Sequence, residues 1–217
     1  MPASTVPDSL LLIAPDCPHC PQVLEALGTL IKDGRIGRLE VVNIASHPER
    51  AAELGVRSVP WCRIGPFVLE GLRSAAELAA WSARVGSPDG VREYVSARLR
   101  SGALAQVEEL VADNPGWLEM LLPLVADEAT ELHVRIGLSA VMEAFSGTQT
   151  LRDLLTPLAL LAAHPAPRVR SDACHFLALT GSPEALGALG GCLDDPDAQV
   201  REIAEEGIEA LRRDGAE

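Results

Sequence analysis

The segment SLLLIAPDCPHC, residues 9–20, is the most informative stretch for the fold of the first part of the chain. Residues 9–14 form a short, continuous apolar run, which is typical of a strand buried on both faces. A Cys-x-x-Cys motif follows at once. After the motif, apolar residues recur at helical spacing, at Val23, Leu24, Leu27, Leu30 and Ile31. The segment therefore predicts a buried strand, a dithiol turn and an amphipathic helix that ends at Asp33-Gly34.

The sequence on either side continues this alternation up to residue 86. Further strands are predicted over 39–43, 61–64 and 67–70, with helices starting at Pro48 and after Ser74. The order β-α-β-α-β-β-α indicates an α/β domain. Residues 86–90 (GSPDG) have the composition of a linker. We therefore expect two domains, residues 1–86 and residues 91–217.

The second part of the chain contains a helical repeat. It becomes visible when Val134-Arg135, Val169-Arg170 and Val200-Arg201 are aligned, at spacings of 35 and 31 residues. From each Val, positions 0, 3, 4, 7, 8 and 11 form an apolar stripe, and only Asp172 clearly breaks it. A helix with such a stripe cannot bury it alone, so stacking of neighbouring repeats is expected.

This pattern resembles HEAT repeats, over about residues 127–213, in which the second helix of a unit begins with such a Val-Arg pair. The resemblance implies an all-α array that binds other proteins. The arginines of the three pairs, Arg135, Arg170 and Arg201, recur in register. We expect them to form an internal ladder with acids such as Asp172, Asp195 and Glu205, the alternative being a binding stripe.

The CPHC motif, residues 17–20, predicts redox chemistry, because a Cys-x-x-Cys that follows a buried strand and opens a helix is typical of a redox dithiol. Pro18 suits the first helical position, which would place Cys17 at the N-cap. The unpaired N–H groups and the positive end of the helix dipole would then favour the Cys17 thiolate. Cys17 is therefore the predicted nucleophile, and Cys20, one turn further, would resolve the mixed disulfide.

The strand, the CPHC motif, its helix and the segment GVRSVP, residues 55–60, together resemble the thioredoxin fold superfamily over about residues 8–86. The resemblance implies a cis-proline at Pro60, beside the dithiol. It also implies that the Val59 backbone pairs with an incoming peptide and that Pro60 keeps metal ions off the thiolate. Gly71 also fits the family pattern.

Two departures from thioredoxin bear on the redox properties. Leu11 stands where thioredoxin has a buried acid, six positions before the first cysteine. The central dipeptide is Pro18-His19, as in oxidising proteins of the DsbA type. We expect His19 to tune Cys17 as a solvated side chain, the alternative being a general base.

Three other interpretations of Cys17 and Cys20 are a structural disulfide, a metal site, and a thioredoxin-like domain that only docks a partner and does not use its dithiol. A closed zinc site would need two ligands besides Cys17 and Cys20, and only Cys62 and His19 are plausible. We expect no metal and no cofactor. Cys62 is predicted to lie in the core, although an extra thiol for disulfide exchange is an alternative. Cys174 and Cys192 are predicted to be small buried residues.

Composition restricts the partners. The chain has 217 residues and a net charge of −13, of which residues 91–217 contribute −11. Phosphate backbones require a basic surface, so no nucleic acid is expected. An acidic helical domain could instead attract a basic protein. No run reaches the roughly 18 apolar residues of a membrane span, and the first basic residue is Lys32, so we expect a cytosolic protein that binds no membrane.

These observations predict a thiol–disulfide oxidoreductase that acts on a protein partner through Cys17 and Cys20. The helical array would select the partner. The alternative is a non-catalytic adaptor in which both domains only bind other proteins.

Overall fold

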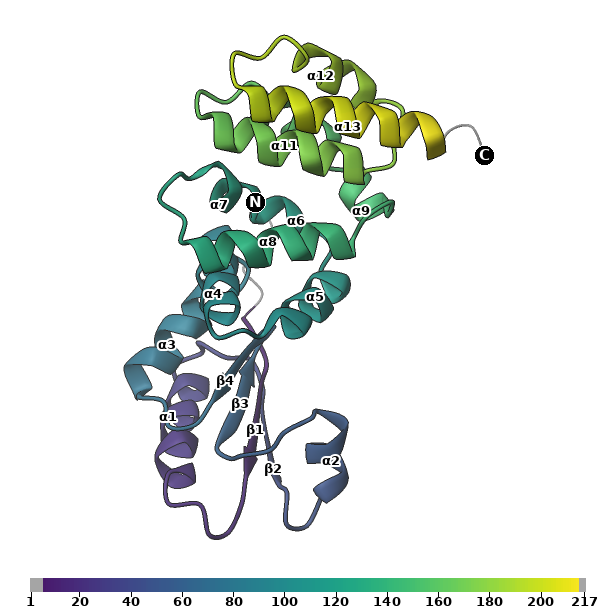
Figure 1. Ribbon diagram of the computed structural model, residues 1–217. Helices are drawn as coiled ribbons and strands as arrows, with labels where there is room; N and C mark the ends of the chain where they lie inside the picture. Colours follow the sequence, from purple (N-terminus) through teal and green to yellow (C-terminus); the bar gives the residue numbers. More distant parts are fainter. Residues whose placement is uncertain (1–5, 215–217) are drawn as a thin grey trace. The chain divides into compact units, whose positions relative to one another are not determined.

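The computed structural model describes residues 6–214 and divides into two compact units, Met1–Val91 and Arg92–Glu217. Within the first unit, the elements alternate between strand and helix (Figure 1). They are β1 (Ser9–Ile13), α1 (Cys20–Lys32), β2 (Leu39–Asn43), α2 (Pro48–Glu53), β3 (Trp61–Ile64), β4 (Phe67–Glu70) and α3 (Ala75–Arg84). This is the predicted β-α-β-α-β-β-α order of a thioredoxin-like α/β domain.

The four strands form one mixed sheet in the order β2-β1-β3-β4. β1 pairs with β2 in parallel, whereas β1–β3 and β3–β4 are antiparallel. The β1–β3 register sets Leu12 opposite Trp61, the first residue of β3. The end of β1 and the start of β3 therefore lie at the same end of the sheet.

Each face of the sheet has its own apolar core, because successive strand residues point to opposite faces. On one face, Leu11 and Cys62 pack with α1 and with Leu78 of α3. On the other face, Leu10, Leu12 and Trp61 pack with apolar residues around α2. Figure 1 shows α1 and α3 on one side of the sheet and α2 on the other.

The second unit is helical throughout its described part. After α4, which crosses from the first unit, come α5 to α13. The helices are α4 (Pro88–Arg100), α5 (Leu104–Asp113), α6 (Trp117–Met120), α7 (Leu122–Ala126), α8 (Leu132–Ala144), α9 (Gln149–Arg152), α10 (Leu155–Leu161), α11 (Pro167–Leu179), α12 (Ala185–Gly191) and α13 (Ala198–Asp214). None of the helices within residues 6–214 is long and apolar enough to cross a membrane.

The prediction that residues 86–90 form a linker is wrong for their second half, because α4 begins at Pro88. The Ser87 hydroxyl accepts a hydrogen bond from the Gly90 amide at 3.0 Å, as an N-cap side chain does. Proline suits the first turn of a helix. Ser87-Pro88 is therefore a helix start that its loop-like composition conceals.

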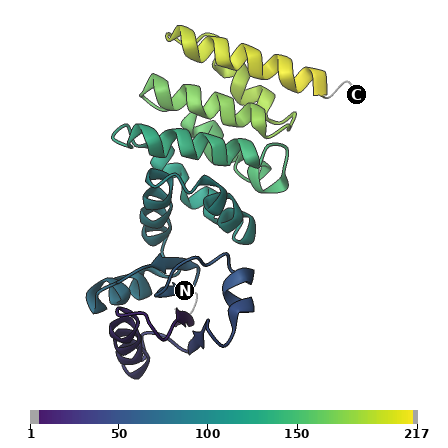
Figure 2. The same ribbon diagram turned by 60° about the horizontal axis from the view of Figure 1, so that its bottom comes forward.

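The three aligned Val-Arg pairs open the successive long helices α8, α11 and α13. Figure 2 shows these helices side by side in chain order, and α11 packs against both α8 and α13. Val134, Val169 and Val200 are buried at equivalent positions. Asp172, the exception in the apolar stripe, is half-buried and pairs with Arg168 at 2.9 Å. The helical unit thus has the HEAT-like arrangement that the sequence predicts.

The predicted arginine ladder is present at one rung. Arg170 donates from Nε and Nη2 to the Asp195 carboxylate, at 2.6 and 2.7 Å. It also donates to the carbonyl of His164, six residues earlier, and Arg201 donates likewise to the carbonyl of Asp195. These two arginines therefore tie the start of their own helix to the preceding loop.

The other two expected ion pairs of the ladder are absent from the described residues. Asp172 pairs with Arg168 instead of an arginine of the Val-Arg series, and the Nε of Arg135 is buried without a hydrogen-bond partner. The charge pattern therefore predicts only the Arg170–Asp195 pair correctly, because the rotation of each helix decides which acid comes within reach.

Candidate active site

The CPHC motif lies in the connection between the end of β1 and the start of α1. Cys17 and Cys20 are joined by a disulfide, with their Cα atoms 5.5 Å apart. The amide of Cys17 donates to the carbonyl of Ala14, and the amide of Cys20 donates to the carbonyl of Cys17, both at 3.3 Å. The dithiol therefore sits in two successive turns directly before the helix.

The prediction that Cys17 caps the helix and that Pro18 is its first residue is wrong. Helix α1 begins at Cys20, and His19 occupies the N-cap position. An N-cap at Cys17 would need an amide at position 21 to bond its carbonyl. Residue 21 is proline and has no N–H, so the first helical bond runs from Val23 to the carbonyl of His19. Pro21 is the residue from which this helix start could have been predicted.

The two bonded cysteines differ in exposure. Cys20 is only 4% exposed, whereas Cys17 is half-buried, and Pro18 and His19 beside it are exposed. A molecule approaching from solvent therefore reaches the Cys17 sulfur more readily than the Cys20 sulfur.

A second loop lies at the same end of the sheet. The Val59–Pro60 peptide bond is cis, and Pro60 directly precedes Trp61, which the register sets opposite Leu12 of β1. This places Pro60 beside the end of β1, from which the dithiol loop departs. The carbonyl of Pro60 accepts a hydrogen bond from the amide of Gly71 at 2.8 Å.

The backbone of Val59 is unpaired among the described residues. Neither its amide nor its carbonyl has a hydrogen-bond partner within residues 6–214. Its side chain is half-buried and packs on the core of Leu10, Leu12 and Trp61, which fixes the position of the backbone. An unpaired donor and acceptor next to a strand end can pair with an extended peptide.

Cys62 lies in the core on the α1 side of the sheet and is 2% exposed. Burial raises the pKa of its thiol to about 12. This thiol is protonated at neutral pH and does not react as a thiolate. Cys174 and Cys192 are also buried. Within residues 6–214, no three His, Cys, Asp or Glu side chains are grouped as metal ligands would be.

Comparison with known families agrees with both halves of this description. A thioredoxin domain model matches residues 10–83, and a HEAT repeat model matches residues 118–209. No curated protein matches the chain. The chain is a fusion of a thioredoxin-like domain with HEAT repeats.

Proposed function

We propose that the protein is a thiol–disulfide oxidoreductase that acts on a protein partner, with Cys17 as the attacking cysteine and Cys20 as the resolving cysteine. The observation that carries this proposal is the unequal exposure of a bonded pair. Cys17 is half-buried, while Cys20 is only 4% exposed. A purely structural disulfide would need no such asymmetry.

The exchange has two steps. In the reduced protein, the Cys17 thiolate attacks one sulfur of the partner's disulfide, and the other partner sulfur leaves as a thiolate that takes a proton from solvent. The Cys20 thiol then loses its proton and attacks the Cys17 sulfur. This closes the Cys17–Cys20 disulfide and releases the partner's second thiol. Two electrons pass from the dithiol to the partner, and the reverse sequence oxidises a partner dithiol.

The proposal also gives roles to the other predicted site residues. The free amide and carbonyl of Val59 would hold the partner's chain in an extended form, and Pro60 would fix that loop beside the dithiol. Pro18 restricts the turn between the cysteines, because its ring fixes φ. His19, exposed beside Cys17, would adjust the electrostatic potential at the sulfur. The HEAT repeats would select the partner.

Trapping the mixed disulfide tests the proposal directly. Cys20→Ser leaves Cys17 free to attack but removes the resolving thiol, so a disulfide-linked complex with a protein partner should accumulate. Cys17→Ser is the matched control and should trap nothing, because the remaining cysteine is buried. Equal trapping by both variants would contradict the assigned roles, and trapping by neither would favour an adaptor.

A further inference from the structure

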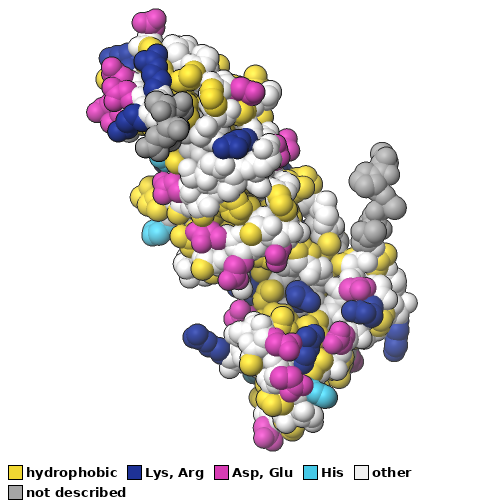
Figure 3. All heavy atoms as spheres, turned by 90° about the vertical axis from the view of Figure 1, so that its right-hand side faces the viewer, with side chains coloured by type: hydrophobic (Ala, Val, Ile, Leu, Met, Phe, Trp, Pro, Cys, Tyr) yellow, Lys and Arg dark blue, Asp and Glu magenta, His cyan; other side chains and the backbone are white. Residues whose placement is uncertain are grey.

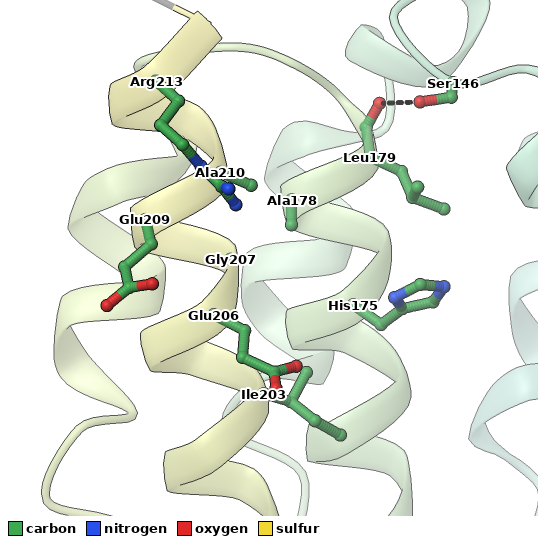
Figure 4. A pocket seen from close by; sticks show the side chains of 10 residues that line it. All are labelled: Ser146, His175, Ala178, Leu179, Ile203, Glu206, Gly207, Glu209, Ala210 and Arg213. Carbon is green, nitrogen blue, oxygen red and sulfur yellow. Dashed lines mark hydrogen bonds between the residues drawn. The ribbon is translucent and has the colours of Figure 1, made fainter.

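A groove of about 590 Å³ runs between α11 and α13 in the repeat array (Figure 4). Half of its lining residues are small or apolar, namely Ala178, Leu179, Ile203, Gly207 and Ala210, and the other half are polar or charged. The two helices come close at Gly207, where an added Cβ would lie 3.0 Å from the Cβ of Ala178. Small residues on both helices therefore leave space for the groove while α11 and α13 pack closely at Gly207 and Ala178.

The rim of the groove carries mostly negative charge. Glu206 and Glu209 line it from α13, and Arg213 lies at its C-terminal end (Figure 4). On the α11 side, the ring of His175 points toward α8, where its Nε2 lies 3.3 Å from a carboxylate oxygen of Glu143. Figure 3 shows apolar side chains exposed among the charged ones on one face of the molecule.

The two rim glutamates belong to a longer stripe. Glu202, Glu205, Glu206 and Glu209 are all exposed and fall on one side of α13, at spacings of three and four residues. Their carboxylates have no ion-pair or hydrogen-bond partner within residues 6–214. Like charges at these spacings destabilise a helix. By contrast, Asp172 and Asp195 of the same array are each paired with an arginine. No ion pair among the described residues therefore offsets the repulsion along α13.

We infer that this groove docks a basic, amphipathic helical segment of the protein partner. The apolar side of the segment would lie on Ala178, Ile203 and Ala210, and its Lys or Arg side chains would face the glutamate stripe. A helix fits because a groove between two neighbouring helices accepts the side-chain ridges of a third. From Ile203 to Arg213 the groove is about 15 Å long, or roughly three turns, at the rise of 1.5 Å per residue.

Charge complementarity selects this occupant over others. A nucleic acid or an anionic membrane would bring more negative charge to the glutamates. A second copy of the same array would do so as well. A basic segment removes the like-charge repulsion on binding. The inference rests on the proposed function only in taking the docked partner to be the substrate of the dithiol.

The test uses the full chain and two synthetic peptides of 14 residues, labelled with fluorescein. One carries leucines at helical spacing and lysines elsewhere, and the other has glutamate in place of each lysine. Binding is measured by fluorescence anisotropy at low and high salt. The test variant is Glu206→Gln/Glu209→Gln. The matched control is Glu109→Gln/Glu128→Gln, which removes the same charge from exposed positions outside the groove.

The lysine peptide should bind, and the Glu206→Gln/Glu209→Gln variant should weaken it by about fivefold at low salt, as two exposed ion pairs allow. The control variant should bind the lysine peptide as tightly as the wild type does, and the glutamate peptide should not bind. Equal weakening by both variants, or binding that survives high salt unchanged, would overturn the inference. Reduction of a small aromatic disulfide by the same samples separates the two proposals, because it needs Cys17 and Cys20 but not the groove.

Discussion

Cys17 and Cys20 have different surroundings although they lie three residues apart and are bonded to each other. Cys17 is half-buried and Cys20 is covered, and under the proposed function this difference sets the order of attack. Leu11 adds to this asymmetry. It is fully buried on the α1 face, so the residue that holds an acid in thioredoxin is here apolar. Leu11 cannot take a proton from Cys20, and we expect slow release of the mixed disulfide.

Alkylation of the reduced protein should reveal the same order. At pH 7, iodoacetamide should modify Cys17 at least about tenfold faster than Cys20, because Cys17 is more exposed. Cys62 should stay unmodified up to about pH 9, since burial raises the pKa of its thiol to about 12. Peptide mass spectrometry after timed quenching measures each site. Fast modification of Cys62 in the folded protein would contradict the burial of its thiol in the core.

The dithiol could be predicted from the sequence because its motif, its strand and its helix are contiguous. The predicted start of the helix is wrong because Pro18 and Pro21 both suit a first turn. They are distinguished by the carbonyl of Cys17, which cannot accept a helical hydrogen bond from Pro21 because proline has no N–H. The free backbone of Val59 could not be predicted from the residues alone, because it depends on which groups the rest of the chain leaves unpaired.

Among the elements, α11 is linked to the loop after α12 by a well-covered ion pair between Arg170 and Asp195. Its arginine and aspartate are 12% and 8% exposed at their side chains, and the two residues are joined by two hydrogen bonds. The hydrogen bonds from Arg170 hold the pKa of Asp195 below its usual value. The pair therefore stabilises the folded array in its charged form.

Asp195→Asn should lower the melting temperature by about 3–6 °C at pH 7. Because the pKa is lowered by folding, this stabilisation is present above the unfolded pKa of about 3.9 and is lost as pH falls through the folded pKa. The difference between wild type and variant should thus be constant from pH 8 to about 5 and shrink below about 4. Asp194→Asn, at the exposed neighbouring position, is the control. A difference that persists unchanged at pH 3 would contradict the ion-pair account.

The repeat helices could be predicted from the sequence, but the contacts between them only in part. Apolar stripes in one register fix α8, α11 and α13, because each stripe needs a neighbour to cover it. The Arg170–Asp195 contact spans 25 residues and depends on the loop that returns from α12. The spacing of the glutamates predicts their stripe on α13. The groove beside the stripe cannot be predicted in this way, because it depends on how closely Gly207 approaches Ala178.

In the whole molecule, the first unit has apolar cores made of its own residues. The sheet of the first unit is covered on both faces by residues of that unit. A fragment of residues 1–91 should therefore fold and reduce a small aromatic disulfide within about twofold of the full-length rate. Circular dichroism and the rate of disulfide reduction check this. An unfolded fragment would mean that the units share a core and that the predicted domain boundary is wrong.

If the first unit folds alone, disulfide chemistry and partner recognition should be separable. The fragment of residues 1–91 should keep its chemistry toward small disulfides but lose mixed-disulfide trapping of the protein partner, because it lacks the repeats that would select that partner. Undiminished trapping by the fragment would show that the thioredoxin-like domain alone recognises the partner.

The equilibrium of the Cys17–Cys20 pair with glutathione buffers distinguishes a redox-active disulfide from a structural one. Under the proposed function, His19 stabilises the Cys17 thiolate and with it the reduced form, so the couple should be more oxidising than the roughly −270 mV of thioredoxin. His19→Ala should shift the midpoint toward thioredoxin's value, by roughly 30 mV for each 1.4 kcal/mol of lost thiolate stabilisation. Alkylation and intact mass give the reduced fraction at each buffer ratio. A disulfide that glutathione does not reduce, a midpoint as reducing as thioredoxin's, or one that His19→Ala leaves unmoved would contradict the account.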